Sequence, residues 1–111
     1  MIPKFRAWEE SAEEGLQMWS WKEMCEVDLG QFFNNPKYEL MQSTGLKDKN
    51  GVEIFEGDIV EYFHTPAVIQ KVKGGFAIVN TGDYEFMTNL KGHIRILGNI
   101  YENPDLVEII Y

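Results

Sequence analysis

The residues that could do chemistry in this 111-residue chain are few and scattered. The two histidines, His64 and His93, are too far apart to form a short metal-binding motif such as His-x-His or His-x-x-x-His. A barrel could still bring them together, with Asp58, Asp83 or Glu85 as further ligands. Isolated histidines usually lie at or near a protein surface, so we expect neither a metal site nor a bound cofactor.

Cys25 is the single cysteine, so an intramolecular disulfide is excluded. Its thiol could act as a nucleophile if His64 or His93 lay beside it in the fold. The neighbouring apolar residues Met24 and Val27 favour instead a thiol packed in the interior.

Acidic side chains gather between residues 53 and 61 and again at Asp83 and Glu85. Paired carboxylates do acid–base chemistry when the fold separates their pKa values. In short turns they are usually solvated, and Asp58 can hold its own turn through side-chain hydrogen bonds. Gly74-Gly75 has neither a Lys-Ser/Thr pair nor a helix after it, which favours a hairpin tip over a phosphate-binding loop. We therefore expect no enzymatic activity.

The net charge of −8 argues against tight binding to a nucleic acid, whose phosphates attract Lys and Arg. Residues 1–41 hold 8 acidic and 4 basic groups and residues 42–111 hold 10 and 6, so each part carries −4. A nucleic-acid-associated small β-barrel is the alternative function, because four cations could form a basic patch beside Phe76 and His93. These cations are Lys71, Lys73, Lys91 and Arg95.

Large aromatic side chains are unusually frequent in the first third of the chain. They are Trp8, Trp19, Trp21, Phe32 and Phe33. Either they form the core of an N-terminal sheet, or some stay exposed and make a protein-interaction patch. The second interpretation predicts contact with another protein, or self-association that includes pairing of a strand edge.

Short apolar runs separated by turn residues indicate an all-β or mostly β fold. Aromatic content favours a strand over a helix for residues 16–27, after a turn-like segment 9–15, and residues 28–37 form a loop. The expected strands cover residues 2–8, 16–27, 38–43, 59–64, 67–73, 76–80, 84–87 and 94–101. Asn103 and Pro104 predict a short helical turn near the C-terminus.

Several turn signals bound these strands. Asn50-Gly51 is a strong hairpin signal because both residue types tolerate a positive φ. Gly45 and Gly57-Asp58 indicate further turns, and Thr65-Pro66 is expected to end a strand. We predict a small antiparallel barrel or rolled sheet, with an aromatic-rich N-terminal sheet in residues 1–41 and a β meander or barrel in residues 42–111.

Three segments resemble the signatures of the YopX-like phage and prophage proteins. They are Ile2–Trp8 (IPKFRAW), Leu40–Val60 (LMQSTGLKDKNG, continued by IFEGDIV) and Gly98–Pro104 (GNIYENP). The resemblance implies a single-domain accessory protein of phages and prophages, and no catalytic residue comes with it. Gly57-Asp58-Ile59-Val60 is also similar to the opening of strands in SH3-like barrels, an analogy of fold alone.

The N-terminus lacks the apolar core of a signal peptide, and no apolar run is long enough to span a membrane. We therefore expect a cytoplasmic protein of the host bacterial cell that has no membrane contact. Its function is expected to be binding or self-assembly.

Overall fold

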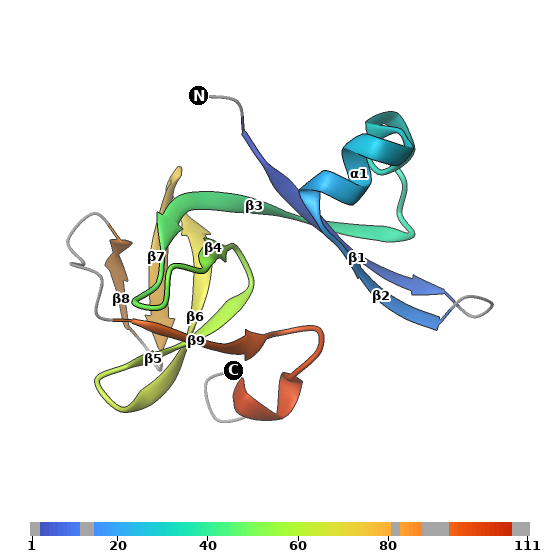
Figure 1. The fold of residues 1–111 in the computed structure, drawn as a ribbon. Coiled ribbons are helices and arrows are strands. Elements are labelled where there is room, and N and C mark those ends of the chain that lie inside the picture. The colour runs from blue at the N-terminus through green and yellow to red at the C-terminus, as the bar shows by residue number, and fades with distance from the viewer. Residues whose placement is uncertain (1–2, 12–14, 81–82, 88–93, 108–111) are drawn as a thin grey trace. The chain divides into compact units, whose positions relative to one another are not determined.

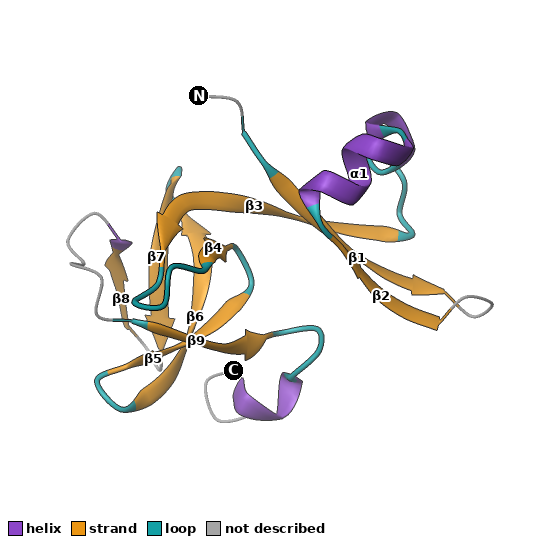
Figure 2. Ribbon diagram, in the orientation of Figure 1, coloured by secondary structure: helices purple, strands orange, loops and turns teal. Residues whose placement is uncertain are grey.

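The computed structural model describes residues 3–11, 15–80, 83–87 and 94–107. The chain divides into two compact units, Met1–Ser43 and Thr44–Tyr111. Within the described ranges it is mostly antiparallel β-strand, with one α-helix and two short 3-10 turns (Figure 1 and Figure 2). The predicted mostly β fold with a short C-terminal helical turn is confirmed.

The N-terminal unit is built around strand β1 (Phe5–Ser11). Antiparallel partners flank it on both sides: β2 (Gly15–Trp19) and the first half of β3 (Tyr38–Lys47). Helix α1 (Trp21–Val27) and the 3-10 turn η1 (Leu29–Gln31) come between β2 and β3 in the chain. The core consists of the buried residues Ala7, Met24 and Phe32, with Phe5, Trp19, Leu29, Tyr38 and Leu40 packed against them.

Two sequence-based predictions are wrong in this unit. Glu9 and Glu10, expected in a turn, continue β1 because they pair with β2. Residues 16–27 are not one strand: β2 ends at Trp19 and α1 begins at Trp21. The physical reason is a capping box. Ser20 Oγ accepts a hydrogen bond from the Glu23 N–H (3.2 Å), and the Glu23 carboxylate accepts one from the Ser20 N–H (2.9 Å).

The C-terminal unit contains a curled five-stranded sheet in the order β8-β7-β6-β5-β9 (Figure 1). Its strands are β5 (Asp58–Tyr62), β6 (Thr65–Val72), β7 (Gly75–Asn80), β8 (Asp83–Phe86) and β9 (Arg95–Asn99). Strands β5 to β8 form the predicted meander, and β9 pairs with β5. Strand β4 (Glu53–Phe55) is the neighbour of β3, and the 3-10 turn η3 (Pro104–Val107) follows β9.

Both faces of this sheet carry apolar side chains. Successive residues of a strand point to opposite faces, and apolar residues occupy consecutive positions here. Val60 and its partner Ala67 belong to a large cluster, while the adjacent pair Ile59 and Val68 packs against Val107 of η3. The members of the large cluster are Ile54, Val60, Ala67, Ile69, Ile78, Met87 and Ile94. The C-terminal helical turn therefore covers an apolar sheet face.

The turn between β5 and β6 lies two residues earlier than the sequence suggests. Phe63 and His64 form a two-residue connection with φ values of 49° and 65°. Two positive φ values suit a tight hairpin, because that backbone matches the twist of the strands. Pro66 lies inside β6 opposite Glu61, so the prediction that Thr65-Pro66 ends a strand is wrong.

Gly45 does not form the expected turn, because it lies inside β3. Its φ of 80° still requires glycine, as at an irregularity in a strand. The hairpin at Asn50-Gly51 is present between β3 and β4, but only Gly51 has a positive φ (82°). The Gly51 N–H donates to the Asp48 carbonyl (3.0 Å), so the tight turn spans residues 48–51.

Candidate protein-interaction surface

Three partly exposed aromatic side chains of the N-terminal unit form two ring contacts, both made by Phe5. Phe5 of β1 lies 6.2 Å from Trp21 at the start of α1 and 5.5 Å from Phe33 after η1, measured between ring centroids. All three side chains are half-buried. We call Phe5, Trp21 and Phe33 the aromatic cluster. The capping box at Ser20 positions it, because that cap determines where α1 begins.

Trp21 is the member of the cluster best suited to hold a partner. Its indole N–H has no hydrogen-bond partner among the described residues. A buried tryptophan normally satisfies this donor, and a half-exposed one can offer it to another protein. Tryptophan is also among the residues enriched at binding hot spots.

Two other aromatic residues predicted to make protein contacts, Trp8 and Phe32, lie in the interior. Phe32 is fully buried and packs against Trp19 and Tyr38, with ring centroids 5.3 and 4.7 Å away. Trp8 is only 6% exposed. Trp8 and Phe32 therefore serve the core and cannot form an external contact surface. Phe5 was not among the residues predicted to make contacts, yet its ring joins Trp21 and Phe33 into one cluster.

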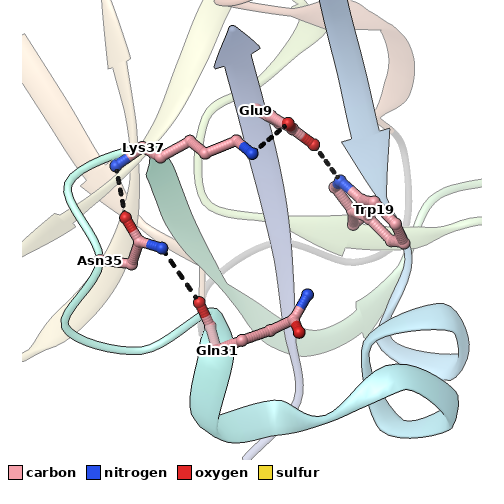
Figure 3. Close-up of polar contacts among 5 residues, drawn as sticks. All are labelled: Glu9, Trp19, Gln31, Asn35 and Lys37. Atoms are coloured by element: carbon pink, nitrogen blue, oxygen red, sulfur yellow. Dashed lines mark hydrogen bonds and ion pairs between the residues drawn. The ribbon is translucent and has the colours of Figure 1, made fainter. Parts of the chain in front are cut away.

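A buried carboxylate connects β1 to its surroundings in the same unit (Figure 3). Glu9 is 1% exposed, and its Oε1 accepts a hydrogen bond from Trp19 Nε1 at 2.8 Å. Its Oε2 lies 3.0 Å from Lys37 Nζ. These contacts hold Trp19 against the sheet, which explains why this half-buried tryptophan does not project freely.

Lys37 is held in place by the loop that precedes β3. The Asn35 amide donates to the Gln31 carbonyl (3.4 Å), and Asn35 Oδ1 accepts from the Lys37 N–H (3.1 Å). Figure 3 shows this chain of contacts from Gln31 to Trp19. Such pairing is needed because a buried charge without a partner is strongly destabilising. The arrangement supports the unit structurally.

Among the described cations of the predicted basic patch, Arg95 lies apart from Lys71. Arg95 pairs with Glu61, which in turn lies opposite Pro66 on β6. Lys71 lies five positions farther along β6, roughly 16 Å at the rise of a β-strand. Arg95 also forms an ion pair with Glu61 at 3.3 Å.

Lys71 and Lys73 lie only two positions apart in the chain. Lys71 lies over the Phe76 ring at 5.7 Å, and Lys73 occupies the β6–β7 hairpin. Lys91 lies outside the described residues, as does His93. Among the described residues of the predicted patch, Arg95 therefore lies apart from Lys71 and Lys73.

Candidate catalytic groups were also located. His64 lies in the β5–β6 hairpin. Cys25 is exposed on α1, so the prediction of a packed thiol is wrong, because this position faces away from the buried Met24. In the described part of the chain, no group of three His, Cys, Asp or Glu side chains could hold a metal ion.

Tyr62 and Glu85 form a hydrogen bond between β5 and β8. This bond to the Glu85 carboxylate raises the pKa of Tyr62, and burial and the charges of Glu85 and Asp83 act in the same direction. The raised pKa keeps the hydroxyl protonated, so it acts as a donor that ties β8 to β5.

Comparison with known proteins identifies the family. Residues 4–108 match the family described as YopX protein. The chain belongs to the YopX family. Its structure is similar to the crystal structure of protein EF1440 from Enterococcus faecalis, with a TM-score of 0.59 and 27% sequence identity. The similarity covers 97% of this chain and 99% of that chain. A search among curated proteins gave no match.

The central segment that resembles the YopX signature contains a structural residue that the sequence analysis missed. Asp48 is 7% exposed, and its Oδ1 accepts from the N–H groups of Asn50 and Val52 (both 2.9 Å). Its Oδ2 accepts from the Ile96 N–H at 3.1 Å, which joins the β3–β4 hairpin to β9. Burial raises the pKa of Asp48, but these backbone hydrogen bonds outweigh it, so the net pKa is lowered.

The C-terminal YopX segment folds into a compact turn. Asn103 Oδ1 accepts a hydrogen bond from the Asn99 N–H (3.2 Å), and the Asn103 carbonyl accepts one from the Leu106 N–H of η3 (3.1 Å). Asn99 is buried, and its Oδ1 accepts from the N–H groups of Tyr101 and Glu102. A Cβ at Gly98 would lie 2.3 Å from Asn103 Oδ1, so only glycine fits.

Hydrogen bonds to the backbone also stabilise the turn in the segment Ile54–Val60. Asp58 is buried, and its Oδ2 accepts from the Phe55 N–H at 2.8 Å. The N–H of Gly57 donates to Ile69, and the Gly57 carbonyl accepts from Ile100. These YopX segments are therefore explained by backbone hydrogen bonds at turns.

Among the described residues, no helix has the length and apolar character needed to cross a membrane.

Proposed function

We propose that this YopX-family chain is a non-catalytic protein-binding module, an accessory protein of a phage or prophage that acts inside the host bacterial cell. The observation that carries the proposal is the aromatic cluster. Phe5, whose ring also packs against the core, contacts both Trp21 and Phe33, and all three side chains remain partly exposed.

A partner that covers half-exposed aromatic rings removes their apolar surface from water, which favours binding. They also lose little conformational entropy on binding, because each ring has only two side-chain torsions and its neighbours already restrict it. Trp21 adds an available indole N–H donor. These properties favour a binding partner with an apolar surface and a hydrogen-bond acceptor opposite Trp21.

The acidic character of the chain determines which partners are favoured. At a net charge of −8, association with a basic or neutral protein is electrostatically easier than association with a nucleic acid or another strongly acidic protein. The partner is therefore expected to be a host or phage protein whose contact surface is not acidic.

A quantitative pull-down from a host lysate tests the proposal. The wild-type chain is compared with Trp21→Ala and with Phe63→Ala, which removes an aromatic ring that is 82% exposed in the other unit. We expect Trp21→Ala to weaken retention of a specific protein at least about tenfold, as for a hot-spot residue, and Phe63→Ala to retain it. Equal retention by wild type and Trp21→Ala would overturn the proposal, provided that circular dichroism shows both variants folded.

A further inference from the structure

Four strands lie at the edges of the two sheets in the described part of the chain: β2, β4, β8 and β9. Natural proteins protect edge strands with short length, charges, prolines or irregularities, because an open edge pairs with other strands. Strand β4 has three residues, and β8 carries Asp83 and Glu85. Strand β9 carries Arg95 and has an irregular register against β5. Each of these three edges is protected.

Strand β2 has none of these protections. Its sequence, Gly-Leu-Gln-Met-Trp, contains no charge and no proline, and its register against β1 is regular over all five residues. Leu16 is 64% exposed and Gln17 is exposed. β2 has only β1 as a strand partner among the described strands.

We propose that β2 pairs with β2 of a second copy of this chain, in an antiparallel arrangement about a twofold axis at Gln17. When two five-residue strands overlap fully in this way, residue 17 faces residue 17 and residue 16 faces residue 18. Leu16 then lies opposite the partner's Met18, and Met18 opposite the partner's Leu16. Opposite residues and residues two apart share one face of a sheet. The pairing therefore joins four exposed or half-exposed apolar side chains into one strip.

Charge favours this edge over the others for contact between identical copies. Every copy carries −8, so pairing through β8 would bring Asp83 and Glu85 toward their own copies. The uncharged β2 edge avoids direct repulsion between opposite residues. The remaining repulsion is long-range and is screened by salt, with a Debye length of about 8 Å at physiological ionic strength. Association should therefore strengthen as salt is added.

This contact is separate from the aromatic cluster and involves a different partner. Strand β2 pairs with residues 7–11 of β1, whereas the cluster lies around Phe5 at the other end of that strand. Either surface can therefore be disrupted without the other. Loss of self-association and loss of the partner captured through Trp21 are distinguishable results.

Light scattering across a concentration series measures self-association, and we expect the wild-type mass to rise toward twice that of one chain. Gln17→Glu places two carboxylates opposite each other and should weaken dimerisation about tenfold. Gln31→Glu is the matched control, because Gln31 is an exposed glutamine in η1 and the change in net charge is the same. Tryptophan fluorescence verifies that both variants remain folded.

A cysteine cross-link tests the register. In a Cys25→Ser background, which removes the exposed native thiol, Gln17→Cys should form an intermolecular disulfide because directly opposite Cα atoms lie about 5 Å apart. Leu16→Cys should fail, since its own copy lies diagonally, beyond about 7 Å. Equal association of wild type and Gln17→Glu, or equal cross-linking by the two cysteine variants, would overturn the proposal. The proposal would also be overturned if the chain stayed monomeric and captured a foreign protein only when its β2 edge was unaltered.

Discussion

The two units of this YopX-family chain stabilise their buried acidic groups with different kinds of partner. In the C-terminal unit, Asp48 and Asp58 accept hydrogen bonds mainly from backbone N–H groups of their own turns. In the N-terminal unit, Glu9 depends on the side chains of Trp19 and Lys37, which come from β2 and from the loop before β3. The first arrangement is local in sequence, and the second is assembled only when the unit folds.

The apolar cores of the two units also differ in the side chains that they bury. The C-terminal unit buries mostly aliphatic side chains on both faces of one curled sheet. The N-terminal unit has a small core in which Phe32 is surrounded by other aromatic rings. A small core loses a larger share of its stability when one side chain is removed. All three tryptophans lie in the N-terminal unit, so their fluorescence reports on that unit alone.

The largest expected effect on the stability of either unit is that of Phe32→Ala in the N-terminal unit. We expect a loss of about 4 kcal/mol in the free energy of unfolding, because a fully buried ring leaves a cavity. Denaturant titration followed by tryptophan fluorescence and by far-ultraviolet circular dichroism measures it. If the units unfold separately, the fluorescence transition shifts and the remaining dichroism change does not. Coincident shifts in both signals would show that the two units unfold together.

Asp48→Asn tests the local arrangement in the C-terminal unit. The amide NH₂ cannot accept a backbone hydrogen bond, so we expect a loss of about 2 kcal/mol. Because the folded pKa of Asp48 is lowered, its contribution is present above about pH 4 and is lost as the pH falls through that folded pKa. Denaturation at several pH values should show the difference between wild type and variant shrinking in acid. A constant difference would contradict this account.

Replacing the β5–β6 hairpin should stabilise the protein. The double change Phe63→Asn and His64→Gly installs residues that tolerate the positive φ values of 49° and 65°. We expect a gain of about 1 kcal/mol, since ordinary side chains are strained in this region. Thermal melting followed by circular dichroism measures the gain. Lys73→Asn in the β6–β7 hairpin relieves strain at one position only (φ 50°), because Gly74 already occupies the next, so we expect a smaller gain there. The absence of any gain in both hairpins would refute the explanation.

An effect of similar size but opposite sign is expected for Ser20→Ala, which removes half of the capping box. A lost cap costs about 1 kcal/mol. Helix α1 positions Trp21, so the tryptophan transition should move to lower denaturant concentration. An unchanged fluorescence midpoint would show that packing of Met24 alone determines where α1 begins.

Local signals in the sequence predicted much of the C-terminal unit. Asn50-Gly51 marks a real hairpin, and the meander of β6, β7 and β8 follows the predicted runs. The error at Thr65-Pro66 arose because Phe63 and His64 are poor turn residues by type. They adopt positive φ because the pairing of β5 with β6 demands it.

The N-terminal unit was harder to predict, although one signal was available. Ser20 followed by Glu23 is a capping-box pattern, and it would have placed the helix start at Trp21. The aromatic content of residues 16–27 concealed it, because aromatic residues favour strands. No sequence pattern pairs Glu9 with Lys37, which lie 28 positions apart along the chain.

The sequence by itself determined the family, the mostly β class and the turn positions that depend on glycine or on an acidic side chain near its own backbone. These are short-range effects, decided within a few residues. Only the tertiary structure decided that Trp8 and Phe32 are buried, that Phe5, Trp21 and Phe33 form one cluster, and that Arg95 lies far from Lys71. Exposure and proximity depend on strand pairing between distant segments, and that pairing is selected by the packing of the whole unit.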